Sequence, residues 1–152
     1  MDLREEHLER ERTAWEAFLA AVGEVPADRL DDRSVVPGWS VKDLVWHNGG
    51  WAGFVGEQLR AMAGGTFVDP FAGHDDAHWD SVNEEMVREG RAMSFDEVLA
   101  AAERSRAGAR EVWSSLPEID EQRAALFADE TAVHYDEHTG DIRAFLDRAV
   151  VR

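Results

Sequence analysis

The sequence contains no cysteine, so disulfide bonds, thiolate metal ligands and a cysteine nucleophile are excluded. Any metal site must therefore use histidine, aspartate or glutamate, and any thiol chemistry must take its sulfur from a small molecule. The sequence also has no G-x-S-x-G motif, no G-x-G-x-x-G motif and no phosphate-binding loop. It therefore lacks the usual signatures of serine hydrolases and of nucleotide-binding folds.

Long apolar runs and basic residues are scarce as well. No apolar stretch approaches the roughly 18 residues that span a bilayer, and the N-terminus, M-D-L-R-E-E-H, is charged. The formal net charge is −16, and Lys42 is the only lysine. This acidity argues against nucleic-acid partners and against anionic membrane surfaces. We expect a cytoplasmic protein whose partner is a small molecule.

The residues that are present predict one helical domain over residues 1–152. The hydrophobic fraction is 44% and there are six tryptophans, enough for a packed core. Apolar residues recur at steps of three and four, with no strand-like alternation. They predict helices over residues 3–22, 41–63, 78–90, 95–115 and 127–149. The four long helices, with a long crossover between the second and third, predict an all-α four-helix bundle.

Two histidines stand out in the last predicted helix. His134 and His138 are four residues apart, so they lie on one helix face, and that face continues through apolar positions such as Ile142 and Phe145. His47 borders the inner face of the helix over residues 41–63. Facing helices of a bundle commonly build metal sites, and three imidazoles leave coordination positions open. The pattern predicts a divalent metal ion bound by His47, His134 and His138.

The same histidines can also be interpreted without a metal, with each imidazole hydrogen-bonded to its own carboxylate. His134 then pairs with Glu130, His138 with Asp141 and His47 with Asp43. One cation would satisfy all three imidazoles at a lower desolvation cost. Imidazole ligands do not distinguish zinc, nickel, iron, manganese and cobalt.

Other candidate residues are less clearly placed. The pair His74 and His78 follows Gly73 in a Gly- and Asp-rich stretch and is interpreted as part of a surface loop. No catalytic residue is assigned. The residues expected to line the pocket are Trp46, Trp51 and Phe54. The candidates for proton transfer are Tyr135 and Glu137.

Two segments resemble a known family. P-G-W-S-V-K-D-L-V-W-H, residues 37–47, and H-Y-D-E-H followed by I-R-A-F-L, within residues 134–146, resemble the DinB-like superfamily of metal-binding four-helix proteins. That group includes thiol-dependent transferases and the N-terminal domain of mycothiol-dependent maleylpyruvate isomerase. The resemblance implies a metal triad, and its positions match His47, His134 and His138.

The resemblance also implies a function. The leading hypothesis is a divalent-metal-dependent transferase that joins a low-molecular-weight thiol, of the mycothiol or bacillithiol type, to small electrophiles for detoxification. The alternative is a non-catalytic bundle that binds a small molecule or gives self-protection, as in colibactin resistance. A third hypothesis gives the histidines a purely structural role. Members of the family often pair through their helices, so a homodimer is also expected.

Overall fold

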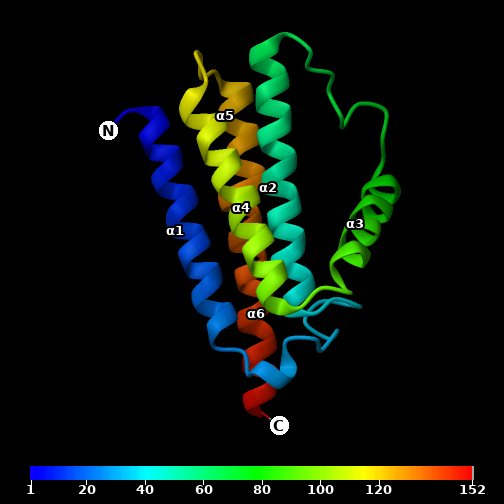
Figure 1. Ribbon diagram of the computed structural model, residues 1–152. Coiled ribbons are helices and arrows are strands. Elements are labelled where there is room, and N and C mark those ends of the chain that lie inside the picture. Colours follow the sequence, from blue (N-terminus) through cyan, green and yellow to red (C-terminus); the bar gives the residue numbers. More distant parts are fainter. Residues whose placement is uncertain (152) are drawn as a thin grey trace.

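The computed structural model describes the backbone of residues 1–151 and the side chains of residues 1–148 (Figure 1). Its helices are α1 (Leu3–Gly23), α2 (Val41–Gly64), α3 (Asp76–Gly90), α4 (Phe95–Ser115), α5 (Glu121–Ala128) and α6 (His134–Val151). Short turns of other types are η1 (Ala27–Arg29) and η2 (Asp129–Val133). No strand occurs over residues 1–151, so the predicted all-α class is confirmed. Within that range, no helix is long and apolar enough to cross a membrane.

Four helical columns form the bundle, and α3 lies outside the bundle, packed against α2. Figure 1 shows α1, α2, α4 and the α5–α6 column side by side, while the crossover from the end of α2 carries α3 along the outside of α2. The predicted four-helix arrangement with its long crossover is therefore confirmed. The sequence shows why α2 and α4 begin where they do: Ser40 with Asp43, and Ser94 with Glu97, form reciprocal capping boxes.

The segment before the last predicted helix differs from expectation. Residues 121–126, for which no structure was predicted, form most of α5 (Glu121–Ala128), and the side chain of Asp120 caps its first turn by accepting from the Arg123 amide. The predicted single helix over residues 127–149 is interrupted by η2, a π-helical turn. A π turn adds a residue to one turn of helix, and such turns are often found at functional sites. Side chains from residue 149 onward lie outside the described part.

The helix pair α2 and α4 packs closely because both present small residues. A Cβ atom built on Gly49 would lie 2.6 Å from the Cα atom of Ala102, and one on Gly56 would lie 3.3 Å from the Cα atom of Ala109. The obstacle in each case is backbone, which cannot swing aside as a flexible side chain can. Glycine at position 49 therefore sets the distance between α2 and α4.

This close approach gives a stability prediction. We expect Gly49→Ala to lower the free energy of unfolding by about 1–3 kcal/mol, because the methyl group forces the two helices apart. The matched control is Gly108→Ala on α4, where an added Cβ atom meets nothing within 4 Å. That substitution should be neutral or stabilise by up to about 1 kcal/mol. Urea denaturation measures both, and equal effects would show that α2 and α4 do not pack as described.

Candidate metal centre

Three histidines meet between α2 and α6. His47 lies on α2, two turns after the Ser40 cap; His134 is the first residue of α6, directly after the π turn; His138 follows one turn later. The Nε2 atom of His134 lies 2.9 Å from that of His47 and 3.0 Å from that of His138. One ligand atom from each residue lies within 4.8 Å of the other two. The structure thus brings together all three predicted ligands.

Burial keeps the His47 and His134 imidazoles uncharged. His47 is 3% exposed and His138 is 8% exposed, while His134 is partly buried. Burial, and then the nearby His134 and His138, lower the pKa of His47 to about 2. Burial and then His138 lower the pKa of His134 to about 3. Near neutral pH both rings therefore offer a lone pair, which is the form that binds metal.

Hydrogen bonds alone cannot satisfy this arrangement. Each ring nitrogen has one in-plane site, which holds either a proton or a lone pair. The Nε2 atom of His134 faces two other Nε2 atoms at hydrogen-bonding distance. If it carries a proton, it can donate to only one of them; if it carries a lone pair, it can accept from only one. One of the two short contacts is therefore always left without a directed hydrogen bond of its own.

A cation removes this mismatch, because it accepts all three lone pairs at once. Imidazole nitrogens bind zinc at about 2.0–2.1 Å, so two nitrogens on one ion lie less than about 4.2 Å apart. Both Nε2–Nε2 contacts of His134 are within that limit. The three histidines can therefore hold a metal ion and would leave coordination positions open to a further ligand.

The separate acceptors considered from the sequence are present for one histidine only. The Nδ1 atom of His138 lies 2.9 Å from the Asp141 carboxylate. Asp43 instead accepts from the Ser40 amide in the capping box. The Nδ1 atoms of His47 and His134 are buried, and no hydrogen-bonding partner reaches either of them within the described side chains. The structure therefore does not pair each of the three imidazoles with its own hydrogen-bond acceptor.

Asp141 should tune the affinity of the site. A carboxylate that accepts from Nδ1–H holds the ring orientation and makes the opposite nitrogen a better ligand. We expect Asp141→Ala to weaken zinc binding by about 10- to 100-fold. Competition titration against a chromophoric chelator measures this, with Asp136→Ala, an exposed carboxylate on the same helix, as the control. Equal affinities for the two variants would remove Asp141 from the site.

Two tryptophans flank His47, and both form hydrogen bonds with side chains of α3. The rings of Trp39 and Trp51 lie 4.8 and 6.4 Å from the His47 ring. The Trp39 indole donates to Glu84 at 2.6 Å, and the Trp51 indole donates to the Asn83 side chain at 2.9 Å. Trp51 was expected to line the pocket; Trp39 was missed, although it lies within the motif over residues 37–47.

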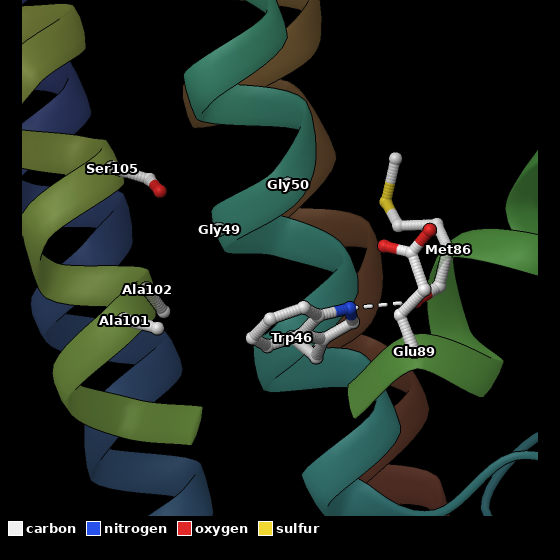
Figure 2. Close-up of a pocket in the computed structure, with 8 residues that line it drawn as sticks. All are labelled: Trp46, Gly49, Gly50, Met86, Glu89, Ala101, Ala102 and Ser105. Atoms are coloured by element: carbon white, nitrogen blue, oxygen red, sulfur yellow. Dashed lines mark hydrogen bonds between the residues drawn. The ribbon is translucent and has the colours of Figure 1, made fainter. Parts of the chain in front are cut away.

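The expectation for Trp46 was wrong. Its indole donates to the Met86 carbonyl at 2.6 Å, toward α3. Figure 2 shows it beside Gly49 and Gly50, between α2, α3 and α4, with α6 behind α2. These residues line a pocket of about 240 Å³. None of the three histidines lines this pocket. Residues 46 and 47 point about 100° apart on one helix, so only one of them can face α6.

The remaining candidates lie away from the triad. Tyr135 is fully buried, its ring packs against Trp15 at 5.0 Å, and burial raises its pKa well above the ordinary value. Glu137 is exposed. His74 lies in the crossover loop, as predicted. His78 lies in α3, which agrees with the helix predicted over residues 78–90 but not with its interpretation as a loop residue; the two rings stack at 3.8 Å. We therefore assign none of these four residues to the chemistry of the centre.

Comparisons with known proteins agree with this fold. The family described as "Mycothiol maleylpyruvate isomerase N-terminal domain" matches residues 12–145. An uncharacterised protein from Escherichia coli UTI89, known from a crystal structure, superimposes with a TM-score of 0.79 at 16% identity, over 96% of this chain and 94% of that chain. At this identity the likeness shows the fold alone. Among curated proteins, none matches the chain.

Proposed function

This chain belongs to the mycothiol maleylpyruvate isomerase N-terminal domain family, and on that premise we propose that it is a metal-dependent thiol transferase. His47, His134 and His138 hold a divalent cation. The protein transfers a low-molecular-weight thiol, of the mycothiol or bacillithiol type, to a small electrophile. A sulfur–carbon bond forms, and the electrophile either takes up the thiol proton, as an activated double bond does, or releases a leaving group. The product is a thioether, and detoxification is the expected role.

One observation carries this proposal: three imidazole nitrogens meet at His134, where no arrangement of their protons satisfies every contact. A site built only for stability would pair each ring with an oxygen acceptor, as Asp141 does for His138. Two of the three rings lack such a partner on the other nitrogen among the described side chains. The donor set suits a cation with positions left open for a ligand.

The cation would activate the thiol, and the protein would orient the metal ligands and exclude water. A bound divalent cation lowers the pKa of a thiol that reaches it, so that thiolate forms near neutral pH. The chain supplies no cysteine, which fits an external thiol. Asp141 orients His138, and the Trp39 and Trp51 rings limit the access of water to His47. The protein thus contributes ligand geometry and a partly dry pocket.

A turnover assay tests the proposal. Protein purified without a histidine tag and loaded with zinc or nickel is mixed with monochlorobimane and either mycothiol or bacillithiol. Monochlorobimane becomes fluorescent when the thiolate displaces its chloride. We expect conjugate formation well above the rate without protein. Tight binding of the small molecules with both recovered unchanged would instead favour the alternative, a non-catalytic binding protein.

A further inference from the structure

An aromatic surface leads away from the metal centre. It consists of Trp51 and Phe54 on α2, Phe71 on the crossover over residues 65–75, and Trp79 on α3; we call these four the aromatic cluster. Trp51 lies 6.2 Å from the His134 ring and 5.6 Å from Trp79, and Phe71 lies 5.0 Å from Trp79. Exposure rises from 6% at Trp51 to 37% at Phe71, so the cluster runs from the triad to the surface.

A pocket of about 220 Å³ adjoins this cluster through Phe71. It lies between α2, the crossover and α5, and its walls include Gln58, Met62, Phe67, Phe71, Gln122 and Leu126. Drug-sized ligands usually occupy pockets of about 300–1,000 Å³. This pocket therefore suits a smaller molecule, with about one aromatic ring and a short substituent.

The charges at the pocket disfavour anions. Asp69 is the only charged residue among those that line it, and no arginine or lysine does so within the described chain. Nearby Arg123, which donates to the Met62 carbonyl at 3.4 Å, pairs with Asp120 at 2.6 Å, so the carboxylate compensates its positive charge. The chain as a whole carries a formal charge of −16. An anionic ligand would meet a negative field here with no cationic side chain to bind it.

From these observations we infer that the aromatic cluster and its pocket bind the electrophile, and that this electrophile is an uncharged, planar aromatic molecule. The aromatic faces supply stacking contacts, and the two glutamine amides supply hydrogen bonds to a neutral polar substituent. The inference deepens the proposed function by naming the class of molecule that receives the thiol, and it excludes carboxylated acceptors.

A matched pair of ligands tests the inference. Cinnamamide and cinnamate share one ring and nearly one shape, but only cinnamate is charged. Calorimetric titration of the metal-free and the metal-loaded protein should show cinnamamide bound at least about tenfold more tightly than cinnamate. Phe71→Ala, on an exposed loop, should weaken cinnamamide binding by about threefold to tenfold. Equal affinities, binding of neither ligand, or no effect of Phe71→Ala would overturn the inference.

A charge-reversal pair locates the site. Gln122 lines the pocket, whereas Ala125 is exposed on the same helix and does not line it. Gln122→Lys should shift the preference toward cinnamate by about fivefold, and Ala125→Lys by less than twofold. Equal shifts would place the ligand elsewhere. Because binding is measured without turnover, a protein that binds cinnamamide in this way but transfers no thiol would support the ligand site and its preference for uncharged aromatic molecules, and would contradict the proposed function.

Discussion

We expect zinc or nickel to raise the melting temperature of the metal-free protein, and His47→Ala to reduce that increase to about a third or less. A ligand that binds only the folded state stabilises it by about 4 kcal/mol at a thousandfold excess over its dissociation constant. For a chain of this length, that corresponds to about 8–16 °C. His47 supplies one of three nitrogens from a separate helix, so its loss leaves two neighbouring ligands on α6 and should weaken binding by at least about a hundredfold. Differential scanning fluorimetry with and without metal measures the increase.

The metal-dependent increase, rather than stability itself, is the decisive quantity. Truncating a buried imidazole changes the stability of the metal-free protein for packing reasons alone, by about 1–3 kcal/mol. The control is His74→Ala, an exposed histidine of the crossover loop, which should retain the full increase. If His47→Ala kept the increase, or if the unaltered protein showed none, the triad would not be a metal site.

Thiol transfer should fall by about 30-fold or more when the metal is removed or when His134 is replaced with alanine. A free thiol with a pKa near 8.5 is only about 3% thiolate at pH 7, so complete ionisation alone raises the reactive fraction by about 30-fold. His134 is the residue to remove, because its Nε2 atom contacts both other ligands. Initial rates of conjugate formation, measured at saturating electrophile, give the size of the loss.

Two comparisons make this kinetic prediction specific. Asp141→Ala should lose less activity than His134→Ala, because Asp141 acts through His138, and excess metal should restore part of its rate. Asp136→Ala, exposed on the same helix, should be unaffected. Transfer that proceeds at the full rate in chelator-treated protein or in His134→Ala would contradict the metal-dependent mechanism.

Capping motifs and apolar spacing in the sequence predicted where the main helices begin and which faces point inward. Helix starts at Val41 and Phe95 followed from their capping boxes, and the apolar stripes identified the inward faces of α2 and α6. Because both stripes included histidine, the meeting of His47 with His134 and His138 could be predicted from the sequence. The π turn could not, because it adds one residue to a turn without a change in the three- and four-residue spacing that marks a helix.

Features that depend on contacts distant in the sequence were missed. Trp39 becomes a wall of the centre through a contact with Glu84, more than 30 residues away, which accepts its indole proton. Trp46 was placed on the wrong side for the same reason, since only the docking of α3 shows which side of α2 its ring faces. Periodicity identifies an inward face, but it does not say which neighbouring helix that face meets.

A crystal structure of the untagged protein, with anomalous data collected at the absorption edges of zinc and nickel, tests the metal centre most directly. We expect an anomalous peak bonded to the Nε2 atoms of His47, His134 and His138, at about 2.0–2.2 Å from each. Absence of any peak after soaking in metal, with the three rings turned apart toward separate oxygen acceptors, would contradict the metal centre and leave the histidines a structural role only.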